Sequence, residues 1–401
     1  MAGMRWMRTP LSIGALAFGS CLVGAGLAEV ALRAVECRDC WYVWPPHLRA
    51  TLHPSPVLLP GVYGPSTFTT NSWGMRGDPV PRAQAYVVVA MGGSGTECLY
   101  QDDLRAWPHV LQQLLSTGGQ TRMSVWVGNA GRSGLNSRHN VVQVEKLLRE
   151  HPHIDAIVML VGVNDLLYRL AADTTYRSNW EISPGLIQIT REAFPARFPD
   201  DSTLPFYKRT GLWRLLHLVR ERLRPEVADL QFRQDERGAG YAHQRLVRRA
   251  ALRVRDSLPD LKTALTEYRA NLLRIVATAR QHGTRLILLT QPSLWRPDLS
   301  ARSRSLLWMG GVGTFPSTHA TEFYSATALM GGMKRYNDEL LSVCAATRAE
   351  CIDLAAAIPK DTTMFYDDAH LNDGGAQRAA EIIASYMLAR PRFGSPSRRS
   401  M

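Results

Sequence analysis

Four short polar segments in this chain carry groups that could cooperate in acyl transfer. They are Gly92-Gly93-Ser94-Gly95-Thr96, Asn129-Ala130-Gly131, Gly162-Val163-Asn164-Asp165 and Asp367-Asp368-Ala369-His370. Together they supply a hydroxyl, a backbone amide, an asparagine amide and a carboxylate beside an imidazole. An activated serine needs such groups to attack a carbonyl and to stabilise the oxyanion that forms.

The first three segments each follow an apolar run that predicts a buried strand. These runs are YVVVAM ending at Met91, VWV ending at Val127 and AIVMLV ending at Val161. From residue 85 the chain alternates such runs with patterns of helical spacing, as doubly wound α/β proteins do. Ligands bind at the carboxyl ends of the strands in such sheets, so we expect the segments to meet in one crevice.

Ser94 has the local sequence of a nucleophile in a tight turn. Its glycine neighbours allow a sharp turn after the strand, and a helix start beyond it would supply backbone N–H groups. An ordinary strand-to-helix turn and a phosphate-binding loop are the alternatives. Both phosphate fingerprints are incomplete, because Cys98 occupies the third glycine position of Gly-x-Gly-x-x-Gly and no Gly-Lys-Ser/Thr follows.

Gly131 and Asn164 are candidate oxyanion donors. Each lies just after a predicted strand, Gly131 with a backbone N–H and Asn164 with a side-chain amide. Glycines end many strands, and Asn-Asp pairs form turns, so either segment taken alone could be structural.

Asp367 and His370 form the strongest local pair. A carboxylate three residues before a histidine can bond its Nδ1–H and leave Nε2 to take a serine proton. The adjacent Asp368 could be the partner instead.

With these motifs the chain resembles the SGNH (GDSL-type) hydrolases. Ser94, Gly131, Asn164 and the Asp367/His370 pair match the four family blocks in order, and Asn71-Ser-x-Gly-x-Arg76-Gly77 resembles envelope-associated bacterial members. The resemblance implies an α/β fold, a three-layer α/β/α sandwich with a central parallel sheet of about five strands (flavodoxin-like).

The resemblance also implies esterase chemistry without metal or organic cofactor. Asp367 would orient His370, and the Ser94 N–H, Gly131 N–H and Asn164 amide would bind the oxyanion. Gly93 departs from the family pattern, which has Asp at that position.

The N-terminus predicts a signal anchor. Pro10 to Ala28 contains no charge and is about long enough to cross a bilayer, and Arg5 and Arg8 precede it. A cleaved signal peptide and a buried amphipathic helix are the alternatives. We therefore expect a membrane-anchored protein of the cell envelope with its catalytic domain outside the cytoplasm (periplasmic), or a secreted protein if the signal is cleaved.

Cysteine spacing and charge add two further expectations. Cys37 with Cys40, and Cys344 with Cys351, could each close a small disulfide loop in an oxidising compartment, but the spacing does not fit a four-ligand zinc site. The net charge of +12 favours anionic partners or reflects a solvated basic surface, and the chain has no nucleic-acid-binding motif.

The expected organisation is an N-terminal signal anchor or transmembrane segment at 1–35, a connecting segment at 36–84, a hydrolase domain at 85–390 and a basic tail at 391–401. A mostly helical insert occupies 168–262, and the glycine-rich stretch from Trp308 to Gly332 predicts a mobile loop.

The leading hypothesis is a serine esterase or acyltransferase whose substrate is an acylated envelope glycan or a lipid ester. The alternative is a catalytically degenerate domain that binds envelope polysaccharide or scaffolds a complex. A cytoplasmic nucleotide-binding protein is a third possibility that the incomplete phosphate fingerprints disfavour.

Overall fold

The computed structural model describes residues 10–35, 41–81, 85–118, 124–178, 183–195, 205–223, 237–313, 315 and 319–390. The Cys37/Cys40 pair and the tail 391–401 lie outside these ranges. The chain divides into two compact units, one of residues 1–40 with 198–228 and the other of residues 41–197 with 229–401. We describe each unit by itself.

The larger unit is built on a five-stranded sheet in which every neighbouring pair is parallel. Its spatial order is β4 (Val125–Asn129), β3 (Tyr86–Gly92), β5 (Ala156–Leu160), β7 (Arg285–Leu289) and β9 (Glu350–Ile352). In β3, β4, β5 and β7 every residue is buried, as continuous apolar runs in a covered parallel sheet require. This order is that of a flavodoxin-like doubly wound fold.

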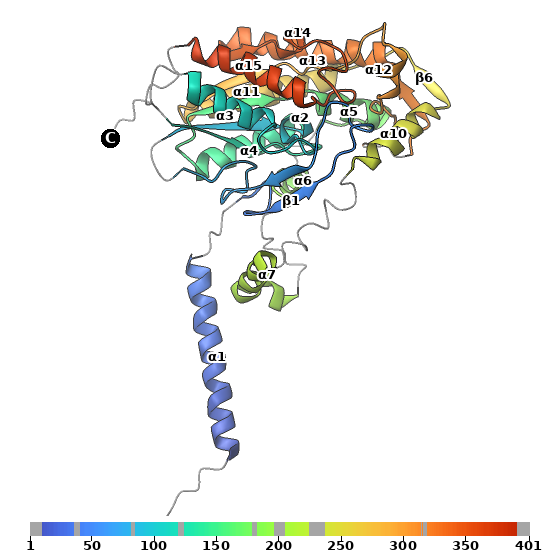
Figure 1. Ribbon diagram of the computed structural model, residues 1–401. Coiled ribbons are helices and arrows are strands. Elements are labelled where there is room, and N and C mark those ends of the chain that lie inside the picture. The colour runs from blue at the N-terminus through green and yellow to red at the C-terminus, as the bar shows by residue number, and fades with distance from the viewer. Residues whose placement is uncertain are drawn as a thin grey trace, which may run out of the picture. The chain divides into compact units, whose positions relative to one another are not determined.

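Two groups of helices accompany the sheet (Figure 1). The first contains α3 (Trp107–Gly118) and α15 (Asp373–Leu388), which pack on each other. The second contains α4 (Ser137–Glu150), α5 (Val163–Ala172), α11 (Lys262–Gln281) and α13 (Ala326–Thr347). Right-handed crossovers in this strand order put the two groups on opposite faces. The three-layer α/β/α fold expected from the sequence is confirmed.

Short helices and strands connect the central sheet and the helices that cover it. The helices are α2 (Ser94–Glu97), η1 (Asp173–Thr175), α6 (Ser183–Ala193), α10 (Ala239–Arg249), α12 (Ala301–Ser305) and α14 (Leu354–Ala357). Two strands of the connecting segment, β1 (Arg49–Leu52) and β2 (Ser66–Thr69), pair antiparallel. Cys344 and Cys351, at the end of α13 and in β9, form a disulfide.

The glycine-rich stretch from Trp308 to Gly332 is not one mobile loop, and that expectation is wrong from residue 322 onward. Glu322–Tyr324 form β8, which pairs parallel with β6 (Arg253–Arg255) of the insert. Ser325 then caps α13 by accepting a hydrogen bond from the Ala328 N–H. A Cβ at Gly332 would lie 2.8 Å from Leu166 Cδ1, so this glycine allows α13 to approach α5 closely.

The smaller unit contains α1 (Pro10–Val35), η2 (Phe206–Arg209) and α7 (Gly211–Leu223). Among the described residues one helical stretch, Leu16–Ala34 of α1, is long and apolar enough to cross a membrane, and none of it is buried. Leader peptides and anchors share these properties.

Candidate active site

Three of the predicted residues form one chain of hydrogen bonds. Ser94 begins α2, directly beyond β3, whereas Asp367 and His370 lie in the loop before α15. Ser94 Oγ lies 2.6 Å from His370 Nε2, and His370 Nδ1 lies 2.7 Å from Asp367 Oδ2. The carboxylate only accepts, so Nδ1 carries the proton and Nε2 accepts from the Ser94 hydroxyl. A neutral His370 can therefore act as a base toward Ser94.

Asp367 is completely buried and accepts four hydrogen bonds. Its Oδ1 accepts from the backbone amides of Ala369 and His370, at 3.0 and 2.9 Å. Its Oδ2 accepts from His370 Nδ1 and from the indole Nε1 of Trp308, at 2.7 and 2.8 Å. Burial raises the pKa of Asp367, but the charge and hydrogen bonds of His370 and the hydrogen bond from Trp308 together outweigh burial and hold this pKa below its usual value.

The electrostatics favour an ionised Asp367 beside a basic His370. Burial alone would lower the pKa of His370, but the charge of Asp367 and its hydrogen bond raise this pKa above the ordinary value for histidine. The imidazolium that forms on taking a serine proton is therefore stabilised.

Asp368, the other candidate partner of His370, has different contacts. Its Oδ1 accepts from Trp295 Nε1 at 2.7 Å, and its Oδ2 accepts from the backbone N–H groups of Trp308 and Met309. Asp368 thus fixes the segment that carries Trp308, whose indole in turn contacts Asp367. The hydrogen bond to His370 Nδ1 belongs to Asp367.

Helix α10 of the insert contacts the loop that carries Asp367 and His370. This contact was not predicted from the sequence. Arg245 is buried and donates to the carbonyls of Leu306 and Tyr366, at 3.1 and 3.0 Å. Tyr241, one turn earlier, meets the His370 ring edge-on at 5.9 Å between centroids. These residues and Trp308 carry no local signature, because each acts on a segment about 60 residues or more distant.

Asn164, at the start of α5, lies close to Gly93, the residue before Ser94. Its Nδ2 donates to the Leu135 carbonyl at 2.7 Å, which uses one of the two amide hydrogens. A Cβ at Gly93 would lie 2.4 Å from Asn164 Nδ2 and 3.0 Å from the Leu135 oxygen. Gly93 has no side chain, whereas the family pattern has Asp at this position, and the Asn164 amide therefore occupies the space that a side chain would fill.

Gly131 is also brought to this edge of the sheet, but its N–H is engaged. It donates to Asn129 Oδ1 at 2.9 Å. A Cβ at this position would lie 2.4 Å from the backbone N of Glu97. Gly131 therefore allows the loop after β4 to pack against α2. To bind an oxyanion at Ser94, the Gly131 N–H would have to break its hydrogen bond to Asn129 Oδ1 or share its hydrogen between the two acceptors.

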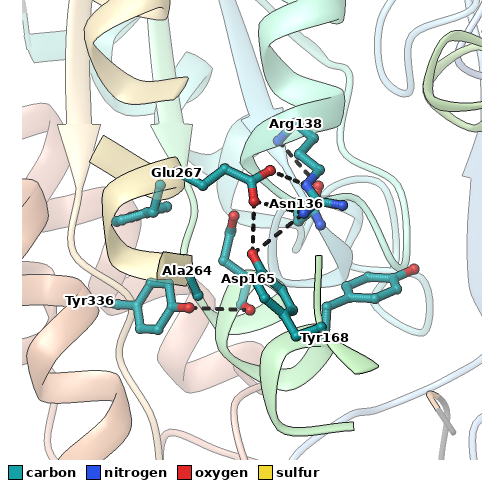
Figure 2. A pocket seen from close by; sticks show the side chains of 9 residues that line it. Asn136, Arg138, Asp165, Tyr168, Ala264, Glu267 and Tyr336 are labelled. Atoms are coloured by element: carbon teal, nitrogen blue, oxygen red, sulfur yellow. Dashed lines mark hydrogen bonds and ion pairs between the residues drawn. The ribbon is translucent and has the colours of Figure 1, made fainter. Parts of the chain in front are cut away.

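A small cavity is lined by residues of α4, α5 and α11, among them Arg138, Asp165 and Glu267 (Figure 2). Asp165 accepts hydrogen bonds from the Ser137 N–H and hydroxyl, which joins the start of α5 to the start of α4. Burial raises the pKa of Asp165 to about 7, although the Ser137 bonds oppose this. Glu267, from α11, pairs with Arg138 and accepts from the Tyr176 hydroxyl at 2.8 Å. This cluster holds the loops after β4 and β5 together.

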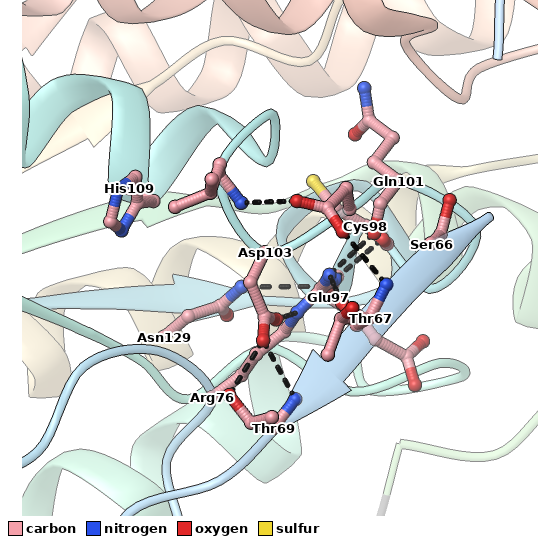
Figure 3. Close-up of polar contacts among 12 residues, drawn as sticks. Ser66, Thr67, Thr69, Arg76, Glu97, Cys98, Gln101, Asp103, His109 and Asn129 are labelled. Atoms are coloured by element: carbon pink, nitrogen blue, oxygen red, sulfur yellow. Dashed lines mark hydrogen bonds and ion pairs between the residues drawn. The ribbon is translucent and has the colours of Figure 1, made fainter. Parts of the chain in front are cut away.

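Arg76 bonds the backbone of the segment that follows Ser94 in the chain (Figure 3). Its side chain is buried, and its guanidinium donates to the carbonyls of Glu97, Cys98 and Gln101 at 2.7, 2.6 and 2.5 Å. It also pairs with Asp103 at 2.8 Å. The motif around Arg76 thus fixes the backbone that follows the candidate nucleophile.

The described residues contain no group of three or more His, Cys, Asp or Glu side chains that could hold a metal ion. The observed fold and site are those of an α/β protein with a serine, histidine and aspartate at the carboxyl edge of its sheet. Residues 90–378 match the GDSL-like lipase/acylhydrolase family, so the chain belongs to that family. Membership supports ester hydrolysis as the class of reaction.

Three solved structures illustrate what the fold of this chain is similar to. LAE5, an alpha/beta hydrolase enzyme from the metagenome of Lake Arreo, Spain, is 14% identical, with 77% of this chain and 98% of that chain covered at a TM-score of 0.40. Axe2, an acetylxylan esterase from Geobacillus stearothermophilus, is 14% identical, with 80% and 99% covered at 0.38.

The third is a member of the lipolytic protein G-D-S-L family from Veillonella parvula DSM 2008. It is 11% identical, with 76% of this chain and 99% of that chain covered at a TM-score of 0.39. No curated protein matches the sequence.

Proposed function

We propose that the protein is a serine esterase or acyltransferase in which Ser94 is the nucleophile, His370 the general base and Asp367 the residue that orients it. The observation that carries this proposal is the unbroken chain of short hydrogen bonds from Ser94 through His370 to Asp367. The experiment that tests it is labelling of Ser94 by a fluorophosphonate probe, with Ser94→Ala as the control.

In this mechanism His370 Nε2 takes the Ser94 proton as Oγ attacks the ester carbonyl. The tetrahedral intermediate collapses when His370 returns the proton to the leaving alcohol, and an acyl-enzyme remains on Ser94. Water then attacks the acyl carbon by the same proton transfers in reverse, whereas a glycan hydroxyl in its place would make the protein a transferase.

The oxyanion would be bound by the Ser94 N–H, the Gly131 N–H and the Asn164 side chain. Asn164 is the best supported of the three, because its amide lies against Gly93 and retains a second hydrogen. The Gly131 N–H would have to turn from Asn129 or share its hydrogen.

Replacement of Asn164 by alanine should lower kcat for ester hydrolysis by roughly 10²- to 10³-fold with little change in KM, because the lost bond forms mainly in the transition state. Steady-state kinetics with a simple nitrophenyl ester measure this. A matched control is Asn337→Ala in α13, whose amide bonds Gln291 instead. If kcat of the Asn164→Ala enzyme were within threefold of the parent value, Asn164 would be excluded as an oxyanion donor.

A Gly93→Ala substitution should lower kcat by about 10- to 100-fold, because the new methyl group displaces the Asn164 amide from its position against Gly93. Gly331→Ala is the matched control, since a Cβ there meets only Leu258 Cδ1 at 4.0 Å. If Gly93→Ala kept parental kcat, the close approach of Gly93 and Asn164 would have no catalytic consequence.

We further propose a membrane-anchored enzyme of the cell envelope that acts outside the cytoplasm, with an anchor at 1–35, a connecting segment at 36–84, a catalytic domain at 85–390 with its insert at 168–262, and a basic tail. The apolar helix α1, the Cys344–Cys351 disulfide and the net charge of +12 support this location. An O-acetyl group on an anionic envelope glycan or a lipid ester is the proposed substrate, and a secreted form would follow from signal cleavage.

A further inference from the structure

The smaller unit joins an apolar helix to a second, shorter helix through one carboxylate. Glu29 of α1 accepts hydrogen bonds from the backbone N–H groups of Gly211 and Leu212, at 2.9 and 3.0 Å. These are the first two residues of α7, so Glu29 caps that helix. A Cβ at Gly211 would lie 3.0 Å from Leu32 Cβ, which shows how closely α7 begins against α1.

The position of Glu29 along α1 sets the level at which α7 begins. The uncharged run of α1 extends from Pro10 to Ala28, and Glu29 is the first charge after it. A carboxylate is costly in hydrocarbon and stable in the headgroup region. Glu29 lies in the last two turns of Leu16–Ala34, the stretch that could cross a membrane, so if α1 spans the bilayer, Glu29 and the start of α7 lie near the membrane surface.

The side chains of η2 and α7 have the exposed apolar character expected at a membrane surface. Phe206 is 81% exposed and Leu216 is 64% exposed, and both belong to a larger exposed apolar set. The other members are Tyr207, Trp213, Leu215 and Val219. In α7 the positions Leu212, Leu215, Leu216 and Val219 recur at intervals of three and four, so they share one face of the helix.

The charge and the aromatic content of this segment also favour a membrane surface. Residues 206–223 contain five basic residues and one acidic residue. Trp and Tyr favour the boundary between headgroups and acyl chains, and basic residues favour anionic lipid. A short amphipathic helix with this composition lies in the plane of a membrane surface.

We propose that η2 and α7 form a second membrane contact, in which α7 lies in the headgroup boundary of the bilayer that α1 crosses and binds anionic phospholipid. The surface is defined by Phe206, Tyr207, Trp213, Leu215, Leu216 and Val219. This inference rests on the anchoring role proposed for α1 and is independent of the chemistry at Ser94. It assigns part of the insert to lipid binding.

The test uses the full chain in vesicles that contain phosphatidylglycerol and brominated phosphatidylcholine. Trp213 is isolated among the other tryptophans by subtracting the emission of a Trp213→Phe variant from that of the parent. We expect the difference emission to lose at least half its intensity when bromine is near the carbonyl end of the acyl chains, and less when bromine is near the methyl end. Omission of phosphatidylglycerol should weaken the quenching.

Three controls make the result specific. Trp126→Phe removes a buried indole of the larger unit, and its difference emission should not respond to bromine. Leu216→Glu, on the proposed surface, should reduce quenching of Trp213, whereas Leu252→Glu, an 85% exposed leucine of the larger unit, should not. Both leucine variants should retain ester hydrolysis and resist alkaline carbonate extraction.

Two results would overturn the proposal. An unquenched Trp213 that is also shielded from iodide would mean that a second copy or another part of the chain covers α7. Extraction of the parent protein by carbonate would show that α1 does not span the bilayer, and the proposal would fall with the anchor. Loss of hydrolysis in Ser94→Ala affects neither readout.

Discussion

Ser94→Ala should abolish ester hydrolysis, with kcat reduced by roughly 10⁴- to 10⁶-fold. The hydroxyl that bonds His370 Nε2 at 2.6 Å is the only nucleophile that the proposed mechanism supplies. Folding should be little affected, because the half-buried side chain is shortened by one atom. Hydrolysis of a nitrophenyl ester and covalent labelling by a fluorophosphonate probe are the two measurements, and the parent should label while the variant should not.

Ser385→Ala is a suitable control, since Ser385 is an exposed serine in α15. It should keep both hydrolysis and labelling. Labelling or near-parental turnover by Ser94→Ala would reject the mechanism. A folded parent that binds envelope polysaccharide but takes up no probe would instead favour the degenerate binding domain.

Asp367→Asn should lower kcat by roughly 10⁴-fold. This carboxylate accepts hydrogen bonds from two backbone amides, from the Trp308 indole and from His370 Nδ1, two at each oxygen. In asparagine an NH2 group, which is a donor, would replace one of these oxygens. Either orientation of the new amide sets donor against donor. The orientation that spares the backbone amides faces His370 with N–H, so Nε2 would carry the proton and could not accept one from Ser94.

The pH dependence supplies a second readout of the same substitution. Asp367 holds the pKa of His370 above its ordinary value, and His370 must be neutral to act as a base. In the parent, kcat/KM should therefore rise with pH through an inflection above that of an ordinary histidine. Without the carboxylate, burial dominates and lowers the pKa of His370, so the inflection should move to lower pH.

Asp368→Asn is the matched control for Asp367→Asn. Asp368 is equally buried, adjacent and bonded to three donors, but none of them belongs to His370. Its loss should lower thermal stability and shift the inflection less. If both variants had the same kcat and the same inflection, the distinct role of Asp367 would be refuted.

The strands that position the site were predictable because their signals are local. Continuous apolar runs before Gly92, Asn129 and Gly162 identify buried parallel strands, and the structure has β3, β4 and β5 there. The small strands were not predictable. β6 and β8 have three residues each, and their pairing joins segments about 70 residues apart. A glycine-rich stretch that suggested mobility contains a strand and the start of a long helix, and two of its glycines, Gly310 and Gly332, allow close packing.

The sequence by itself determined which side chains are available: a serine after a strand, an asparagine after another, and an aspartate three residues before a histidine. Chain order and residue type are local properties, so they were enough for the family and the class of reaction. Only the tertiary structure decided how these groups are held. The support from Trp308 and Arg245, and the space that Gly93 leaves for Asn164, depend on contacts between segments far apart in the chain. Such contacts form only when the whole chain folds, because burial and hydrogen bonding are set by what packs around a residue and not by its neighbours in sequence.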